Sequence, residues 1–323
     1  MAESCLYLSR ADVERAAVGI TEIIEALEKM FLEKAAGRVE MPPKPGIHPK
    51  PDAFIHAMPA FIPALGSAGV KWVSGFPDNP KFGRPYISGL IVLNDHETGL
   101  PLAVMDCTWI TAKRTGAATA VAAKRLARPD SRVVGVLGCG VQGRSNLEAV
   151  AAVFSLARVV AYDIVPAAVD RYRAEMSGIL GLEIVAARSP EEAVKESDIV
   201  VTAGPLLKVP HATIRPGWLR RGAFASLVDY DSYWSREALG ETDKFCTDDI
   251  PQMDYYKSLG YFVGIPPVHA DLSDLVAGRK PGRETEAERT MTCNLGLALE
   301  DMATAPLVYR RALAKGLGTR LDL

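Results

Sequence analysis

The sequence predicts an α/β fold, in which a doubly wound parallel sheet is combined with a second, α+β domain. Residues 133–137 form a short apolar run, and a glycine-rich turn and a helical pattern follow it. β-rich and helical runs then alternate up to residue 247, which is typical of parallel strands joined by crossover helices. Residues 68–106 instead contain three strands at short spacing, which predicts an antiparallel meander. The central sheet is therefore expected to be of the Rossmann type.

The turn after the first apolar strand has the spacing G-x-G-x-x-G, with its glycines at Gly138, Gly140 and Gly143. In a dinucleotide site the first glycine makes a tight turn, the second lets the backbone approach the pyrophosphate, and the third lets helix and strand pack closely. The helix that follows offers free N–H groups to the phosphates. The alternative is an ordinary strand-to-helix turn without a ligand. We expect this loop, including Val141 and Gln142, to bind a cofactor.

A second strand supports the cofactor interpretation, because it ends in Asp163, 25 residues after the first glycine of the turn. An acid at about this spacing accepts hydrogen bonds from the adenosine ribose and repels a 2′-phosphate. Residues 164–166 include no arginine that could hold such a phosphate, so NAD is favoured over NADP. Thr202, Ala203 and Gly204 follow a later strand, and we expect them near the cofactor, since cofactor loops lie at the carboxyl ends of parallel strands.

The composition argues against several classes of protein. The chain has 323 residues with a formal net charge of -2, so nothing indicates a nucleic-acid or anionic-membrane partner. Its five cysteines are scattered without a C-x-x-C pair, which favours free thiols in a reducing compartment over disulfides or a metal site. The sequence has no signal-peptide pattern and no apolar run of the roughly 18 residues that a membrane span requires. We therefore expect a cytoplasmic enzyme without a metal.

The two ends of the chain are expected to be helical. Ser9 is placed to cap a first helix, with Asp12 three residues on, and residues 20–36 have the periodicity of an amphipathic helix. Residues 291–315 are expected to be mainly helical, and residues 316–323 to form a tail.

A proline-rich segment follows the second helix. Residues 40–63 contain seven prolines, which predicts a stiff extended segment with one edge strand over 54–58. Lys44, Lys50 and His56 lie in this segment and either line a pocket or are solvated. The sequence alone favours the solvated alternative.

Two basic residues further on are candidates for holding an anion. Lys71 lies inside an apolar strand, so its side chain must point either to water or to a buried anion. Residues 108–126 predict an alanine-rich helix capped by Thr108, and Arg114 in its second turn could bind a planar carboxylate through two hydrogen bonds or lie exposed. Residues 127–131 break the helix and read as a linker.

Several separated segments together resemble the ornithine cyclodeaminase/μ-crystallin family. The R-T-G-A-A element followed by the G-x-G-x-Q-G-R turn is more specific than the glycine spacing alone. The matching segments run in order along nearly the whole chain: 41–44 (MPPK), 58–60 (MPA), 69–71 (GVK), 98–103 (TGLPLA), 111–118 (TAKRTGAA), 138–144 (GCGVQGR) and 296–301 (GLALED).

The resemblance implies two domains and, usually, a homodimer. Residues 1–127, completed by 297–323, would form a substrate-binding and dimerisation domain. Residues 128–296 would form the Rossmann domain, with the active site in the cleft between the domains.

The resemblance also assigns roles to single residues. In family members a lysine and an arginine hold the substrate carboxylate, and these match Lys71 and Arg114. The family's acid beyond a Rossmann strand matches Asp231, with Asp229 ranked second. Arg114, Thr115 and Asp231 are in addition expected to lie next to the cofactor.

The implied activity is that of an NAD-dependent enzyme at the Cα–N bond of an amino or imino acid. The leading interpretation is an ornithine cyclodeaminase-like enzyme, which converts L-ornithine, or a related substrate, to proline and ammonia. One alternative is an alanine-type dehydrogenase, a ketimine or pyrroline-carboxylate reductase, or an opine-forming dehydrogenase. Another alternative is a μ-crystallin-like protein that binds NAD(P)H without turnover.

The sequence departs from the cyclodeaminases at positions that bear on the substrate. His56 stands where they carry an acid, Tyr86 where a small hydroxyl residue is usual, and residues 293–296 where a serine-containing run is usual. Residues 229–234 add aromatic bulk. We expect Lys44, His56 and Tyr86 to line the substrate site, and the histidine to suit ornithine's second ammonium less well than an acid would.

Overall fold

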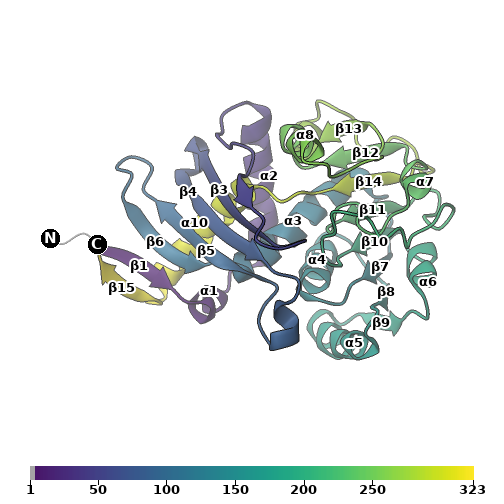
Figure 1. Cartoon of the computed structure of the whole chain (residues 1–323), viewed down its shortest axis with the longest axis horizontal. Helices are drawn as coiled ribbons and strands as arrows, with labels where there is room; N and C mark the ends of the chain where they lie inside the picture. Colours follow the sequence, from purple (N-terminus) through teal and green to yellow (C-terminus); the bar gives the residue numbers. More distant parts are fainter. Residues whose placement is uncertain (1–3) are drawn as a thin grey trace. The chain divides into compact units, whose positions relative to one another are not determined.

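The structure, a computed structural model, describes residues 4–323, and the chain divides into two compact units (Figure 1). The first unit comprises the chain up to Arg114 together with Gly296–Leu323, and the second comprises Thr115–Leu295. The division falls inside helix α3 (Thr108–Leu126). The domain boundary expected after residue 127 lies just beyond this helix, and it stays a prediction.

The first unit is built on a mixed seven-stranded sheet within the described residues, with strand order β15-β1-β6-β5-β4-β3-β2 (Figure 1). Strands β4, β5 and β6 are antiparallel neighbours, so the predicted meander is confirmed. The strands are β1 (Ser4–Leu8), β2 (Gly46–Ile47), β3 (Phe54–Ile62), β4 (Ser67–Gly75), β5 (Ile87–Asn94), β6 (Pro101–Asp106) and β15 (Thr319–Asp322), with short 3-10 turns η1 (Pro63–Leu65) and η2 (Asn79–Phe82).

Strand β3 is longer and more central than the edge strand predicted over 54–58. It pairs with β4 along its whole length, and β2 flanks its other side. Pro59 lies inside it without interrupting this pairing. The N–H groups of Ala57 and Phe61 donate outward, to carbonyls of the segment 40–45. The missing N–H of Pro59 therefore falls on the outer side of β3, away from β4, where a proline is tolerated.

The prediction of a C-terminal tail is wrong for the residues of β15. This strand pairs antiparallel with β1, which in turn pairs parallel with β6. All four residues of β15 are exposed, so its sequence lacks the alternation of buried and exposed positions that marks a strand. Strand β1 was also not predicted.

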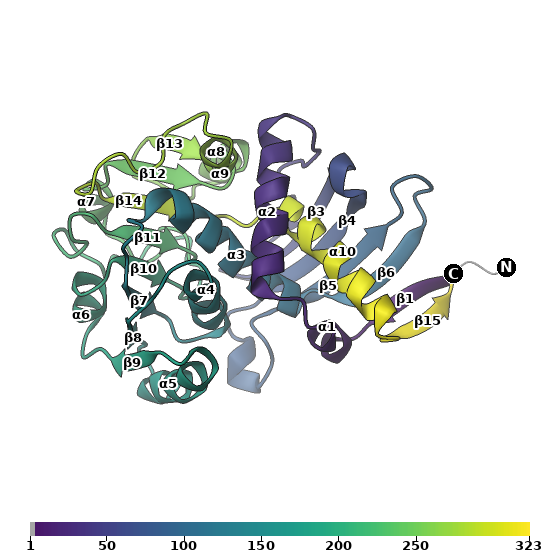
Figure 2. The ribbon, with the colours of Figure 1, turned by 180° about the vertical axis from the view of Figure 1, so that it is seen from behind.

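Helices α1 (Arg10–Ala16), α2 (Ile20–Ala35) and α10 (Ala298–Ala314) complete the first unit. Ser9 caps α1 in a capping box with Asp12, as predicted. Helix α10 packs on α1, α2 and strands β3 to β5, and Figure 2 shows α2 and α10 on one face of the sheet. The side chains on that face of β3 and β4 are consequently buried.

A buried hydroxyl ties α10 to the sheet. Pro306 lies inside the helix and has no N–H for the carbonyl of Met302, one turn earlier. The hydroxyl of Ser67, on β4, donates to this carbonyl at 2.6 Å. Ser67 is fully buried. The strand thus supplies the hydrogen bond that the proline removes from the helix.

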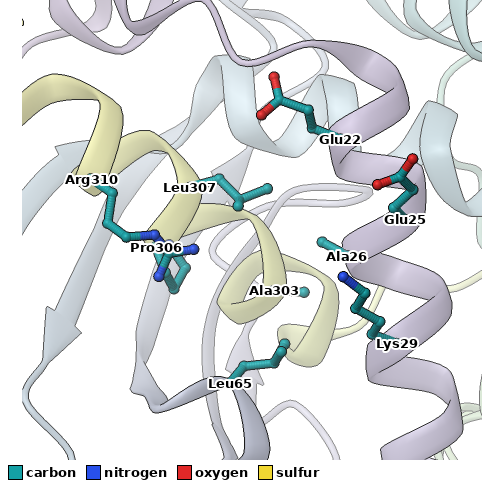
Figure 3. A pocket seen from close by; sticks show the side chains of 9 residues that line it. All are labelled: Glu22, Glu25, Ala26, Lys29, Leu65, Ala303, Pro306, Leu307 and Arg310. Carbon is teal, nitrogen blue, oxygen red and sulfur yellow. The ribbon is translucent and has the colours of Figure 1, made fainter. Parts of the chain in front are cut away.

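A hollow of about 220 Å³ lies between α2, α10 and η1 in the first unit (Figure 3). Its lining mixes carboxylates and basic groups with apolar side chains: Glu22, Glu25, Ala26, Lys29, Leu65, Ala303, Pro306, Leu307 and Arg310. None of the residues predicted for the site lines it.

The second unit contains an all-parallel sheet with strand order β13-β12-β14-β11-β10-β7-β8-β9 (Figure 1). The chain runs outward from β7 through β8 to β9 and then returns to β10, so the strand order reverses between β7 and β10. The Rossmann-type sheet is therefore confirmed. Its strands are β7 (Val133–Leu137), β8 (Arg158–Tyr162), β9 (Glu183–Ala186), β10 (Ile199–Thr202), β11 (Phe224–Leu227), β12 (Lys244–Thr247), β13 (Val268–Asp271) and β14 (Thr290–Cys293).

Helix α10 confirms that residues 291–315 are mainly helical, but strand β14 takes up the first residues of this range. It inserts between β11 and β12, and its four residues are all buried, so they show no alternation that would distinguish a strand from a buried helix. The helices of this unit, besides part of α3, are α4 (Val141–Ala151), α5 (Pro166–Leu180), α6 (Pro190–Lys195), α7 (Arg236–Leu239), α8 (Ile250–Ser258) and α9 (Leu272–Val276). No helix in the described part of the chain is long and apolar enough to cross a membrane.

Candidate active site

The glycine turn joins β7 to α4 at the point where the strand order reverses. Two of its glycines are required by the protein itself. Gly138 has φ 103°, and a Cβ there would lie 2.5 Å from the carbonyl oxygen of Ala203. A Cβ on Gly143 would lie 2.2 Å from the carbonyl oxygen of Gly138. A side chain at either position would therefore force the backbone apart.

Gly140 differs from its two neighbours. Its φ of -85° suits any residue, and no atom of the described residues lies within 4 Å of a Cβ built there. The fold therefore has no reason of its own for a glycine at this position. Open space beside a helix N-terminus that presents free N–H groups fits the pyrophosphate of a dinucleotide.

Asp163 lies directly after β8, next to the turn. One of its carboxylate oxygens accepts from the N–H of Cys139 at 2.8 Å, and the other from the N–H of Val165 at 2.9 Å. Each oxygen keeps a second lone pair, so the oriented carboxylate can still accept from ribose hydroxyls. The residue identity and the geometry thus fit a dinucleotide ribose.

Arg144, which was not predicted as a site residue, holds the turn. Arg144 donates through Nη1 to the carbonyls of Cys139 and Gly140, the latter at 3.1 Å, and through Nε to Glu175 at 2.7 Å. The Cys139 side chain is buried, and burial raises its thiol pKa to about 12. It is therefore a neutral packing group rather than a reactive thiolate.

Two acids follow β11 and differ in their contacts. The carboxylate of Asp229 accepts from the hydroxyl of Thr202 at 2.6 Å and from the N–H of Gly204 at 2.9 Å. Burial raises its pKa to about 7. Asp229 thus fixes the loop after β10, which includes Thr202, Ala203 and Gly204, the residues predicted to lie near the cofactor.

Asp231 has a different environment. Its side chain is 4% exposed, and burial raises its pKa to about 6. Between the two acids Tyr230 has a left-handed φ of 64°, while its ring packs against Tyr256 and Phe262. A carboxyl group that titrates near neutral pH suits proton transfer, and strained backbone is common beside functional groups.

In the first unit, Lys71 and Arg114 lie in one buried cluster of charges, which we call the charge cluster: Lys71, Arg114, Glu300 and Asp301. The Lys71 ammonium lies 2.6 Å from Asp301 Oδ2 and 3.4 Å from the hydroxyl of Thr111. Arg114 Nη1 lies 2.7 Å from Glu300 Oε2, and Arg114 Nε lies 3.3 Å from Asp301 Oδ1. Of the alternatives open for the two cations, burial against anions is correct and exposure is wrong.

Glu300 and Asp301 were not predicted as site residues, although they lie in a segment that carries the family resemblance. Both are fully buried, in the first turn of α10, where the helix dipole stabilises carboxylates. Glu300 Oε2 also accepts from the N–H of Leu297 at 3.2 Å. The signal that could have identified them is two adjacent acids in the first turn of a helix that continues with a mainly apolar run, residues 302–308.

The solvated alternative is wrong for two residues of the proline-rich segment. Lys44 is buried and donates to the carbonyl of Gly296 at 3.2 Å. His56 is also buried and stacks on Phe54. Burial, and then the charges of Lys44, His48 and Lys71, lower the His56 pKa to about 3, so its imidazole is neutral at pH 7. Lys50 is exposed.

Tyr86 and Thr115 complete the predicted set. Tyr86 is half-buried just before β5, and its carbonyl accepts from the N–H of Phe76 at 2.9 Å. Thr115 is buried on α3, in the second unit. The structure thus brings Lys44, His56, Lys71 and Arg114 together in the first unit. In the second unit, the glycine turn, Asp163 and the loop fixed by Asp229 lie at the carboxyl ends of β7, β8, β10 and β11.

The two units define a class: Rossmann-type α/β proteins with an additional mixed-sheet unit that buries paired charges. The family model described as ornithine cyclodeaminase/mu-crystallin family matches residues 4–316, and the chain belongs to this family.

Similar proteins cover almost the whole chain. Alanine dehydrogenase of Archaeoglobus fulgidus is 36% identical over 325 residues, with 98% of each chain covered. A second similar protein is Δ1-pyrroline-2-carboxylate reductase of Thermococcus litoralis, whose structure was solved in complex with NADH and L-proline. It is 36% identical in sequence and superposes with a TM-score of 0.89, and the match covers 97% of this chain and 99% of that chain. The structure of an archaeal alanine dehydrogenase dimer with bound NAD is 34% identical in sequence, with a TM-score of 0.89. The match covers 99% of this chain and 100% of that chain.

Proposed function

We propose that the protein is an NAD-dependent oxidoreductase that interconverts a small amino acid with one amino group and its imine, as an amino-acid dehydrogenase or a cyclic-imine reductase does. The observation that carries this proposal is the buried pair of cations, Lys71 and Arg114, beside the neutral His56. The similar alanine dehydrogenase and pyrroline-2-carboxylate reductase support the same reaction class.

NAD is the proposed cofactor, and when bound it supplies a hydride acceptor or, as NADH, a donor. The open space at Gly140 and the oriented carboxylate of Asp163 fit its pyrophosphate and ribose. Asp163 would repel the 2′-phosphate of NADP. The remaining contacts would come from the turn residues Val141 and Gln142, the loop 202–204, Arg114 and Thr115.

Lys71 and Arg114 would bind and orient the substrate carboxylate. Both are charged donors in a site from which water is largely excluded, where charge-assisted hydrogen bonds are strong. Fixing the carboxylate fixes the position of Cα, which is a contribution to rate through orientation. Lys44 adds a third buried cation to this end of the site.

Asp231 would act as the base that takes the ammonium proton when the amino acid is oxidised, and returns it when the imine is reduced. Only a neutral amine has the lone pair that drives oxidation of the Cα–N bond. With a pKa of about 6, Asp231 is mainly a carboxylate at neutral pH and is still basic enough to accept that proton.

The substrate is proposed to carry one amino group rather than two. A substrate such as ornithine requires an anion for its second ammonium, and His56 stands where the cyclodeaminases carry an acid. Its pKa of about 3 makes it a neutral group at pH 7. The two acids nearby, Glu300 and Asp301, are paired with Arg114 and Lys71.

A homodimer is the proposed assembly, because the similar archaeal alanine dehydrogenase is a dimer. Sedimentation velocity of the full chain tests this directly. A single species at the mass of one chain, over a wide concentration range, would contradict it.

The function is tested by incubating the protein with NAD⁺ and L-alanine, L-proline or L-ornithine, and with NADH and Δ1-pyrroline-2-carboxylate or pyruvate plus ammonia. We expect net formation of NADH from one of the first two amino acids, or consumption of NADH by its imine. Proline and ammonia from ornithine without net NADH would instead identify a cyclodeaminase. Tight NADH binding without turnover of any substrate would favour a binding protein.

A further inference from the structure

The acids at the start of α10 have a role beyond neutralising their neighbours. We propose that Asp301 is a positioning residue, which holds Lys71 and Arg114 at the spacing that binds a substrate carboxylate. This inference rests on the proposed function, because it assumes that the two cations bind that carboxylate.

One carboxylate bridges both cations. Asp301 Oδ2 lies 2.6 Å from the Lys71 ammonium, on β4, and Oδ1 lies 3.3 Å from Arg114 Nε, on α3. Glu300 Oε2 contacts the same guanidinium at Nη1, 2.7 Å away. Of the four acidic and basic side chains, only Asp301 touches both cations, so the distance between Lys71 and Arg114 depends on it.

A third buried cation lies beside the charge cluster. The two cations Lys71 and Arg114 are paired with the two anions Asp301 and Glu300, and all four side chains are almost fully buried. Lys44 adds one more buried cation through its contact with Gly296, whose backbone lies against the Arg114 guanidinium. Lys71, Arg114 and Lys44 thus give this part of the first unit three buried cations, and a substrate carboxylate would bind close to them.

The helix that carries Asp301 is itself fixed. Glu300 accepts from the N–H of Leu297 and so closes the first turn of α10. Helix α10 packs against α2, toward which Leu307 extends in Figure 3, while Asp301 contacts β4 and α3. The helix is thus held from two sides, which keeps the Asp301 carboxylate in place.

Asp301 also maintains the charge of Lys71. Burial and the charge of Arg114 lower the Lys71 pKa, while Asp301 raises it. The other groups that face Lys71 carry no charge at pH 7: the Cys107 thiol, whose pKa burial raises to about 11, the Thr111 hydroxyl and the His56 imidazole. Without the Asp301 anion the Lys71 pKa falls further, and the lysine loses its proton at a lower pH.

The experiment compares Asp301→Asn with Ser67→Ala in the full-length protein. Ser67 also joins β4 to α10, through Met302, but it does not touch the charge cluster. Calorimetry would measure the affinity for pyrrole-2-carboxylate, a planar analogue of a cyclic imino acid, with NADH present, at several pH values. The NADH affinity would be measured separately.

We expect Asp301→Asn to bind pyrrole-2-carboxylate at least about tenfold more weakly, with a loss that grows as the pH rises. NADH affinity should change less than probe affinity, because most of the proposed cofactor contacts come from the glycine turn, Asp163 and the loop 202–204, which Asp301 does not hold. Ser67→Ala should lower the melting temperature and leave the pH dependence of probe binding unchanged. Wild-type affinity and pH dependence in Asp301→Asn would overturn the inference.

A second variant covers the case in which Asp301→Asn does not fold. Asp301→Glu keeps the anion and changes its reach, so it should weaken probe binding while preserving the wild-type pH dependence. Unchanged probe affinity in this variant would also count against the inference. If the wild-type protein binds the probe in an Asp301-dependent way but turns over no substrate, the proposed function fails and the positioning role stands.

Discussion

The glycine turn of the second unit and the charge cluster of the first unit, the two proposed binding sites, are built in opposite ways. The turn uses backbone, and its glycines and Asp163 lie within 26 consecutive residues. The charge cluster uses side chains from β4, α3 and α10, and more than 200 residues separate Lys71 from Asp301. A backbone site can be recognised from local spacing. A site made of side chains that are distant in sequence depends on the complete fold.

Substitutions in the two sites should also have different effects. At Gly140 the fold leaves open space, so a substitution there should affect the ligand more than the protein. In the charge cluster every side chain is buried and paired, so removing one leaves its partner as an uncompensated charge. Effects on stability and on function should therefore be separable at Gly140 and linked in the charge cluster.

The largest expected effect is at Arg114. Arg114→Ala leaves Glu300 without its buried cation and should lower the free energy of unfolding by about 3–5 kcal/mol. Activity should be lost as well, since the substrate carboxylate loses one of its donors. Urea unfolding measures the first effect. Lys113→Ala, one residue earlier on α3, is the matched control and should cost about 1 kcal/mol or less. Equal effects of both variants would contradict the distinct role of Arg114.

Replacement of Asp231 should affect rate and leave binding intact. Asp231→Asn should lower kcat by about 10²- to 10⁴-fold, with little change in NADH affinity. In the wild-type protein, kcat/KM for oxidation should rise as the pH increases through about 6, because Asp231 must be deprotonated to accept a proton. Stopped-flow kinetics across pH measures both. Retention of this pH dependence in Asp231→Asn would show that another group is the base.

The glycine turn can be dissected by two substitutions. Gly140→Val should reduce NADH affinity by about tenfold or more while the melting temperature stays close to wild type, because φ is ordinary and the space is open. Gly143→Ala should instead destabilise the protein by about 1–3 kcal/mol, because its Cβ would meet the Gly138 carbonyl. Fluorescence titration and thermal unfolding separate the two outcomes. A large loss of stability in Gly140→Val would remove the contrast between the two sites.

The smallest effect concerns the pH dependence of stability at His56. The folded state takes up a proton here only near pH 3, while the unfolded chain does so near 6.5. The stability from neutral His56 is therefore present above pH 6.5 and is lost as the pH falls from there toward 3. His56→Gln should reduce this acid-side loss by about 1–2 kcal/mol between pH 7 and 5. Parallel pH dependence of unfolding in both proteins would contradict it.

The sequence allowed the elements with local signals to be predicted. The meander of β4 to β6, helix α3 and the parallel strands around the glycine turn follow from periodicity and turn residues. Strand β15 could not be found, because its side chains are all exposed, and β14 could not, because its side chains are all buried. Neither has the alternation on which strand prediction depends.

Like the fold, the candidate site was only partly predictable from the sequence. The resemblance supplied Lys71 and Arg114 as candidates, but their partners Glu300 and Asp301 remained hidden, because pairing between residues so far apart leaves no periodic signal. The proline-rich composition also led to a wrong prediction, that Lys44 and His56 are solvated. Both are buried through contacts that only the folded chain provides.

The discontinuity of the first unit has a consequence for folding during synthesis. A ribosome completes Thr115–Leu295, a continuous segment, before it adds the residues of α10. Lys71 and Arg114 therefore emerge long before the acids that neutralise them, and the first unit cannot bury these cations until the last helix is made. The nascent chain should fold its second unit first and close the first unit only near the end of translation.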